Sequence, residues 1–275
     1  MRITRHGPHL LQLTRYAAVF PMNCYLVREA DGLTLIDSTM GSPAADVAAV
    51  AAELGLELRR VALTHAHADH VGGVAGIRAR FPGVEVSIGA RDARLLAGDR
   101  SLDAGEPKAP IKGYFVDANW KPDRLLTPGD RVGSLEVVAA AGHTPGQIAF
   151  LDQRDRSLVA GDAFQTRGGI AVAGVLRPLF PFPAMATWHR PTALATGEAL
   201  RDLRPSRLAT GHGDVLEEPG AAMGGRSKPP AEPSAEDQPS RPRQVSPGPS
   251  TAGSQCVSCA RGPAGAGRAR DPRTR

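Results

Sequence analysis

Residues 63–73, LTHAHADHVGG, constrain this chain more than any other segment. His65, His67, Asp69 and His70 fall within six positions, and three of the eight histidines in the 275-residue sequence lie here. Side chains two positions apart in an extended segment point to the same side, so His65 and His67 share one face. Asp69 and His70 follow where the chain turns into the next predicted helix. Histidine and aspartate are both metal ligands, so the segment predicts a metal site.

Three other short apolar segments also end in a side chain that can bind a metal. VALT precedes His65, and VVAAAG precedes His143 in the same way. SLVAG precedes Asp162, and RLATG precedes His212. Ligand sites in α/β proteins gather beyond the carboxyl ends of strands. We therefore expect these four points to converge at one edge of the sheets.

The candidate ligands exceed what one tetrahedral ion can use. They are five histidines and two aspartates, namely His65, His67, Asp69, His70, His143, Asp162 and His212. A set of this size suits two metals that share a bridging group. Nitrogen and oxygen ligands favour Zn²⁺, and they also suit Fe or Mn.

Strand and helix patterns alternate along most of the chain. Residues 22–39 are predicted to form a β-hairpin, because two apolar runs flank Asp31-Gly32. Residues 42–56 are predicted to form a helix with Ser42 as its N-cap. Further strands are expected at residues 59–64, 83–89, 133–142, 146–153, 157–161 and 206–211, and further helices at 71–81, 90–98 and 185–205, the last with a break at Pro191. This alternation predicts a layered α/β arrangement with mixed sheets.

Residues 221–275 differ sharply in composition from the rest. After Met223 the only large apolar side chains are Val245 and Val257. Such a segment buries too little apolar surface to offset its ordering entropy, so it is predicted to be a disordered basic tail. A genuine tail and an out-of-frame translation of GC-rich DNA both fit this composition. Nine basic and four acidic residues in the tail account for the whole formal charge of +5, so no nucleic-acid surface is expected on the neutral remainder.

Four motifs resemble those of the metallo-β-lactamase superfamily in their order and spacing. They are THAHADH at 64–70, GHTPG at 142–146, GDA at 161–163 and GH at 211–212. The resemblance implies an α/β fold, an αββα four-layer sandwich in which two mixed β-sheets pack face to face with helices outside. We therefore expect one metallo-β-lactamase-like hydrolase domain at residues 1–220, followed by the tail at 221–275.

The resemblance also implies how the ligands divide between two divalent ions, expected to be Zn²⁺. The first ion would be held by His65, His67 and His143. The second would be held by Asp69, His70 and His212, and Asp162 would bridge both. Asp37, in the segment LIDSTMG, is expected to position a loop or a ligand and not to bind a metal.

In having a bridging aspartate at position 162, the chain resembles the hydrolase branches of the family and not its true β-lactamases. Those branches include glyoxalase II-type thioesterases, lactonases and related esterases. The lactonase pattern has a tyrosine soon after this aspartate, where this chain has Phe164-Gln165. Glyoxalase II continues into a helical domain, for which the residues after His212 show no pattern. The chain therefore resembles the small single-domain hydrolases of the family.

The function that the resemblance implies is hydrolysis of an ester, thioester or lactone-type carbonyl. Two metals lower the pKa of a shared water toward about 7, so neither serine nor cysteine is needed as a nucleophile. Asp69 is expected to orient the hydroxide and is therefore the catalytic candidate.

Two irregular segments are candidates for the substrate site. Residues 105–123 contain Tyr114 and Trp120, and residues 174–188 contain Phe180. Apolar groups around a neutral site predict an uncharged, partly apolar small-molecule substrate. The alternative is that both segments only cover the core.

Other functions remain open on the same ligands. A mononuclear-iron oxidoreductase resembling persulfide dioxygenases would use His65, His67 and His143 or Asp162. A phosphodiesterase or nuclease would use both metals, and a non-catalytic metal-binding protein would use neither for chemistry. Metal analysis with oxygen uptake separates the oxidoreductase from the hydrolase.

The sequence also predicts where the protein resides. The first sixteen residues lack the continuous apolar stretch of a signal peptide, and no apolar run is long enough to span a bilayer. The three cysteines provide no disulfide framework. We therefore expect a cytoplasmic protein that does not associate with membranes.

Overall fold

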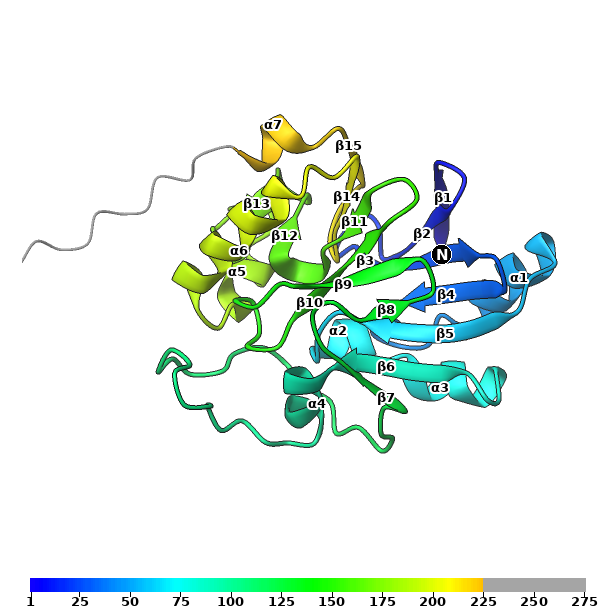
Figure 1. The fold of residues 1–275 in the computed structure, drawn as a ribbon, viewed down its shortest axis with the longest axis horizontal. Helices are drawn as coiled ribbons and strands as arrows, with labels where there is room; N and C mark the ends of the chain where they lie inside the picture. Colours follow the sequence, from blue (N-terminus) through cyan, green and yellow to red (C-terminus); the bar gives the residue numbers. More distant parts are fainter. Residues whose placement is uncertain (225–275) are drawn as a thin grey trace, which may run out of the picture. The chain divides into compact units, whose positions relative to one another are not determined.

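The computed structural model describes residues 1–224, in which two β-sheets lie face to face (Figure 1). The first sheet has seven strands in the order β1 (Arg2–His6), β2 (Leu10–Arg15), β3 (Met22–Glu29), β4 (Gly32–Ile36), β5 (Leu58–Leu63), β6 (Glu85–Gly89) and β7 (Arg124–Leu126). The second has six in the order β15 (Leu216–Glu217), β14 (Arg207–Ala209), β11 (Ser157–Val159), β10 (Ile148–Asp152), β9 (Leu135–Ala139) and β8 (Arg131–Val132). A separate ribbon pairs β12 (Phe164–Gln165) with β13 (Ala171–Val172).

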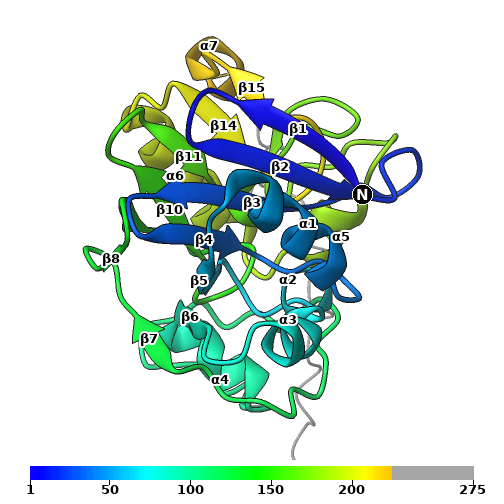
Figure 2. The same ribbon diagram turned by 90° about the vertical axis from the view of Figure 1, so that its right-hand side faces the viewer.

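Helices cover the outer faces of the sheets. Those that follow strands of the first sheet are α1 (Ala44–Leu54), α2 (Ala68–Val71), α3 (Val74–Arg80) and α4 (Ala90–Leu96). Those nearer the second sheet are the 3₁₀ turn η1 (Gly161–Ala163), α5 (Phe182–Ala186), α6 (Arg190–Asp202) and α7 (Gly220–Met223). Figure 2 shows α1 and α3 in front of the first sheet. This is the αββα sandwich that the motifs predict.

Three buried apolar layers separate the four structural layers. The first lies between the seven-stranded sheet and α1, α3 and α4, and it includes Leu26 and Leu35. The second lies between the two sheets and includes Val27 and Ile36. The third lies between the six-stranded sheet and α6, and it includes Leu151. Successive residues of β3 and β4 therefore face opposite layers, which is why these strands are apolar along most of their length.

The strands that precede the candidate ligands all end at the same edge of the sandwich. In the first sheet β4, β5 and β6 are parallel. In the second, β11 and β14 are parallel, and β9 points the same way because β10 is antiparallel to both β9 and β11. The two edges meet directly, since the backbone N–H of Ile148 donates to the carbonyl of Thr64 at 3.0 Å.

Most predicted elements form where they are expected, including the hairpin of β3 and β4 and the helix α1. Ser42 is not the N-cap that the sequence predicts, because Pro43 occupies this position. The Ser42 hydroxyl still accepts from the N–H of Ala44 at 3.2 Å. The helix expected at 185–205 is broken as predicted, but the break lies at 187–189 and not at Pro191. The chain is extended before it, at 187–189, because the N–H groups of Trp188 and His189 donate to carbonyls at 143 and 142. Pro191 lies in the first turn of α6, where proline is tolerated.

The predicted boundary between residues 220 and 221 falls within α7. Met223 of this helix is buried in the third apolar layer. The remainder of the predicted tail, residues 225–275, lies outside the described residues. Within residues 1–224 no helix combines the length and apolar character that a membrane span requires.

Hydrogen bonds from β3 hold the segment 210–213, which carries His212. The side-chain amide of Asn23 donates to the carbonyls of Thr210 at 2.8 Å and Gly213 at 2.7 Å. The hydroxyl of Tyr25 donates to the carbonyl of Thr210 at 2.7 Å. All of these groups are buried, so they tie one sheet to the loop at the end of the other.

We expect Asn23→Ala to lower the free energy of unfolding by about 1–3 kcal/mol, because two buried carbonyls each lose one of their donors and keep only Tyr25 or Gln12. Tyr25→Phe removes a single donor and should cost about 0.5–1.5 kcal/mol. Urea unfolding of the metal-free proteins measures both, with the exposed Tyr16→Phe as control. An Asn23→Ala midpoint equal to that of the wild type would contradict this role.

Candidate metal centre

All seven predicted ligands meet at the shared edge of the two sheets. They form two neighbouring groups, and within each group the candidate ligand atoms lie within 4.8 Å of one another. The first group is His65, His67 and His143, and the second is Asp69, His70, Asp162 and His212. Apart from the partly exposed Asp69, every member is buried.

The first group has the spacing of three ligands of one tetrahedral site. His65 Nε2 lies 3.1 Å from His67 Nδ1, and His67 Nδ1 lies 3.0 Å from His143 Nε2. Two nitrogens at 2.0–2.1 Å from a tetrahedral zinc ion are about 3.3 Å apart. The three nitrogens are therefore already close to the separation that one ion requires.

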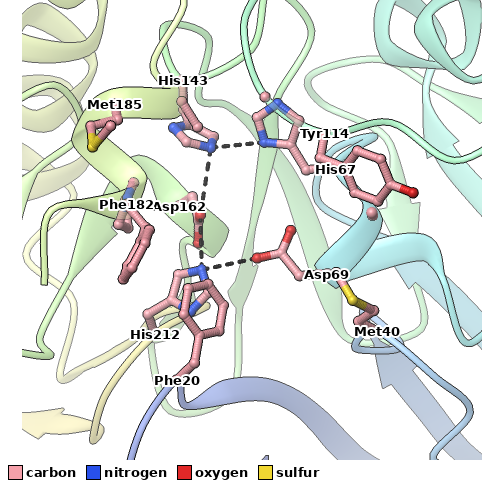
Figure 3. Close-up of a pocket in the computed structure, with 14 residues that line it drawn as sticks. Phe20, Met40, His67, Asp69, Tyr114, His143, Asp162, Phe182, Met185 and His212 are labelled. Carbon is pink, nitrogen blue, oxygen red and sulfur yellow. Dashed lines mark hydrogen bonds and ion pairs between the residues drawn. The ribbon is translucent and has the colours of Figure 1, made fainter.

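Asp162 belongs to the second group and lies on the side that faces the first group (Figure 3). Its Oδ2 is 3.5 Å from His143 Nε2 in the first group and 3.3 Å from His212 Nε2 in the second. Its Oδ1 is 3.4 Å from His70 Nε2. Asp69 Oδ2 completes the second group at 3.2 Å from His212 Nε2. The carboxylate of Asp162 is thus placed where a bridging ligand would be.

Backbone carbonyls fix the orientation of two of the imidazoles. His67 Nε2 lies 2.9 Å from the carbonyl oxygen of Lys112, and His212 Nδ1 lies 2.7 Å from that of Pro21. A carbonyl can only accept, so each of these nitrogens carries the hydrogen. The opposite nitrogen of each ring, which faces the centre, is then the one with a lone pair when the ring is neutral.

Side chains fix the other three rings in the same way. Asp37 Oδ2 lies 2.8 Å from His70 Nδ1, which confirms that Asp37 positions a ligand. The hydroxyl of Thr64 donates to Asp37 and so accepts from His65 Nδ1 at 3.0 Å. The hydroxyl of Thr187 donates to the carbonyl of Pro183 and so accepts from His143 Nδ1 at 3.1 Å. Such outer contacts set the tautomer of a metal-binding histidine.

Two atoms at the centre, His70 Nε2 and Asp162 Oδ1, are buried and make no hydrogen bond, and their only close polar contact with each other is an ion pair at 3.4 Å. Buried polar atoms are nearly always paired, so each points to a missing partner. Five imidazoles and two carboxylates are the ligand types of Zn²⁺, Fe and Mn sites. The residues present therefore fit two divalent ions.

The two groups differ in charge without metal. Burial is the main reason that the pKa of His143 lies at about 3, and burial also lowers the pKa of His65 and His67. These three rings are therefore neutral at pH 7. Burial acts in the same direction on His212, but Asp162 and Asp69 outweigh it and raise that pKa to about 10.

The pKa values of the other members of the second group also depend on burial opposed by neighbouring charges. Burial would lower the pKa of His70, but Asp37, Asp162 and Asp69 together hold it well above its usual value. Burial would raise the pKa values of Asp69 and Asp162, but the two neighbouring histidines keep both below the usual range. The second group is therefore a network of ion pairs, whereas the first group is uncharged.

Asp92 is a positioning residue that sequence reasoning missed. It is fully buried, and its carboxylate accepts from the N–H of Ala66 at 2.9 Å, the hydroxyl of Thr144 at 2.8 Å and the N–H of Gly146 at 2.8 Å. Ala66 separates His65 from His67, and Thr144 follows His143, so this carboxylate joins both ligand-bearing loops of the first group. A signal existed in the sequence, since Asp92 follows a strand end at Gly89 as the ligands do.

Close approach of backbone to ligand explains two glycines. A Cβ on Gly211 would lie 2.1 Å from Asp162 Oδ1, and one on Gly113 would lie 2.0 Å from His67 Nε2. Gly113 also has φ of 100°, which other residues rarely adopt. The loop at 112–114 can therefore bring its carbonyl to His67 only through glycine.

A cavity of about 340 Å³ opens onto the ligands, and Tyr114 lines it together with His67, Asp69, His143, Asp162 and His212. The other two predicted substrate contacts lie elsewhere. Phe180 is buried with its ring centroid 5.2 Å from that of His212, so it packs against that ligand. Trp120 packs against the first apolar layer, beneath the guanidinium of Arg78 at 5.8 Å. The sequence placed both on irregular segments, whose course no local pattern determines.

Comparison with known proteins identifies the family. The sequence model described as the metallo-beta-lactamase superfamily matches residues 17–212. The chain belongs to the metallo-beta-lactamase superfamily. The fold and the family that the four motifs predict are thereby confirmed. The match begins just before β3 and ends at the last ligand, His212, so it includes all seven candidate ligands.

Similar proteins in the superfamily have names that denote different activities or none. The uncharacterized protein YobT of Bacillus subtilis is 46% identical over 224 residues, which cover 81% of this chain and 96% of that protein. A persulfide dioxygenase of Mus musculus is 31% identical, covering 54% of this chain and 51% of its own length. A hydroxyacylglutathione hydrolase of Stenotrophomonas maltophilia is 28% identical, covering 58% and 52%. The chain spans about half the length of the last two.

Solved structures agree on the fold. A metallo-beta-lactamase from Pontibacter korlensis has a TM-score of 0.61 at 16% identity, over 81% of this chain and 94% of that one. TTHA1623 in a di-iron-bound form has a TM-score of 0.53 at 25% identity, over 81% and 97%.

We expect Asp92→Ala to release metal mainly from the first group of this metallo-beta-lactamase-type centre, because both loops that carry it lose a shared acceptor. Metal content per chain should fall from about two equivalents toward about one. Asp152→Ala is the matched control, since Asp152 is also buried but pairs with Arg154 away from the ligands. Equal metal loss in both variants would show that Asp92 contributes only general stability.

Metal affinity should depend on pH differently in the two groups. His212 must lose its proton to bind an ion, so lowering the pH should weaken the second group by about tenfold per pH unit for each proton displaced. The first group should change little between pH 6 and pH 8, because the pKa of His143 is already about 3. Chelator competition with Zn²⁺ measures this, using His143→Ala to isolate the second group and His212→Ala to isolate the first. The same pH slope in both variants would contradict the assignment.

Proposed function

We propose that this protein is a metal-dependent hydrolase whose dinuclear zinc centre activates water for attack on an ester, thioester or lactone-type carbonyl. The observation that carries the proposal is the position of Asp162, which is 3.5 Å or less from histidines of both groups. A bridging carboxylate and a complete second group suit a dinuclear site. The similarity to a hydroxyacylglutathione hydrolase, whose name denotes hydrolysis of an acyl derivative of glutathione, supports the same class of reaction.

The cavity offers none of the hydroxyl, thiol or amine nucleophiles of serine, threonine, cysteine or lysine, which supports water in that role. Within the described part of the chain, the residues that line it include no serine, threonine, cysteine or lysine. When bound, two divalent ions would lower the pKa of a shared water toward about 7 and polarise the substrate carbonyl.

Asp69 is the residue that we propose as proton acceptor. It lines the cavity, and its side chain is 19% exposed, whereas that of Asp162 is 4% exposed. Its pKa lies below the usual range, because His70 and His212 outweigh the effect of burial, so the carboxylate is ionised at neutral pH. Asp69 can therefore take a proton from water on the cavity side while Oδ2 remains near His212.

The competing functions have weaker support. A mononuclear-iron oxidoreductase would leave Asp69, His70 and His212 without a ligand role, although the similarity to a persulfide dioxygenase keeps oxygen chemistry as the second candidate. A phosphodiesterase would bind an anion in a cavity whose described lining has no lysine or arginine. A small-molecule substrate suits the cavity better than a polymer does.

We expect metal-loaded protein to hydrolyse an aryl ester, a thioester or a lactone faster than bis(p-nitrophenyl) phosphate or a β-lactam, without oxygen uptake. Asp69→Asn should lower kcat by about 10²–10⁴, because the proton acceptor is lost. Asp162→Ala should lose activity together with metal. Chelation should abolish turnover, and Zn²⁺ should restore it.

Three results would count against the proposal. Oxygen consumption in place of hydrolysis would favour the oxidoreductase. Faster cleavage of the phosphodiester than of the carbonyl substrates would contradict carbonyl hydrolysis. An Asp69→Asn variant with full kcat and both metals would contradict the role of Asp69.

A further inference from the structure

The mouth of the cavity is apolar on two opposite sides. Met40 and Tyr114 lie on one side, and Phe182 and Met185 lie on the other, with the ligands between them (Figure 3). These four side chains are 44–69% exposed, although each is large and apolar. Apolar groups that remain in water around a concave site usually contact a ligand.

The side that carries Phe182 is built as a rigid aromatic cluster. The ring of Phe20 is 5.1 Å from those of Phe180, Phe182 and His212, measured between centroids. The ring of Phe180 is 5.3 Å from that of Phe182. One wall of the cavity is therefore continuous with the packing of a metal ligand, which places an apolar surface directly beside the reacting position.

The side chains that line the cavity disfavour substrates with carboxylates of their own. No lysine or arginine lines the cavity in the described part of the chain, and the charged groups at its floor are the metal ligands themselves. Lys112 precedes the lining residue Gly113, but it reaches the centre only with its backbone carbonyl. A substrate with a carboxylate on the arm that lies away from the metals would place it among apolar side chains without a lysine or arginine partner, which is unfavourable.

We propose that the substrate is an uncharged carbonyl compound with one short apolar arm, which lies between Met40 and Tyr114 on one side and Phe182 and Met185 on the other. This rests on the proposed hydrolase function and adds to it the substrate class. The cavity of about 340 Å³ is at the lower end of the range for small-molecule sites, so the arm is short. Anionic thioesters of the glutathione type are disfavoured.

The test measures binding without turnover. Hydroxamates bind active-site metals, so three of them are titrated into the metal-loaded protein by calorimetry. They are acetohydroxamate, hexanohydroxamate and adipic monohydroxamate, the last two matched in length but different in that one ends in a carboxylate. Hexanohydroxamate should bind about tenfold or more tightly than either of the others, because only it buries an uncharged chain.

Variants assign the effect to the cleft. Phe182→Ala and Met185→Ala should each reduce the preference for hexanohydroxamate several-fold with metal content unchanged. Met185→Lys should strengthen binding of adipic monohydroxamate, because it supplies the missing cation. Leu176→Ala is the matched control, since Leu176 is 61% exposed on the same segment and does not line the cavity.

The outcomes separate this inference from the proposed function. Equal affinity for the two long hydroxamates, a preference that survives both alanine variants, or no binding of any hydroxamate overturns the apolar-arm assignment. If hexanohydroxamate is preferred as expected while no ester, thioester or lactone is hydrolysed, the reaction is wrong and the cleft assignment stands.

Discussion

Each ring nitrogen that faces away from the centre is held by a hydrogen bond, and the geometry of the site depends on this constraint. Two of the acceptors are backbone carbonyls, at Lys112 and Pro21, so the loops that carry them must be placed before the ligands can point inward. The sandwich provides that placement. Asn23 ties β3 to the loop of His212, and the indole of Trp188 donates to the carbonyl of Ala109 at 3.0 Å. Rigid elements thereby position a centre built largely from loops.

The fold was predictable wherever a local pattern determines it. The strands that end before His65 and His212 are apolar along their last residues because both faces of each sheet are buried, and this pattern is visible in the sequence. The place of the break before α6 was not predictable, because it depends on carbonyls at 142 and 143 that lie more than forty residues away. The hairpin of β1 and β2 was not predicted either, and β1 is exposed along most of its length.

The site, like the fold, has parts that the sequence predicts and parts that it does not. The ligands could be found because each follows a strand end, and strand ends of one direction meet at one edge. Asp92 occupies an equivalent place after β6, but it carries its effect through Ala66, Thr144 and Gly146, and such contacts appear only in three dimensions. The apolar mouth of the cavity could not be predicted from the sequence either. Met40 comes from the loop before α1 and Met185 from α5, and no pattern links them.

The different charges of the two groups explain how such a cluster can be buried at all. The first group is neutral without metal, so its burial costs little. In the second, the raised pKa values of His70 and His212 and the lowered pKa values of Asp69 and Asp162 describe two imidazolium ions paired with carboxylates. An unpaired buried charge is expensive, and this pairing avoids it. A divalent ion that displaces both protons leaves the total charge of the group unchanged. The bridging Asp162 then supplies negative charge to the neutral group, which is where a second ion needs it.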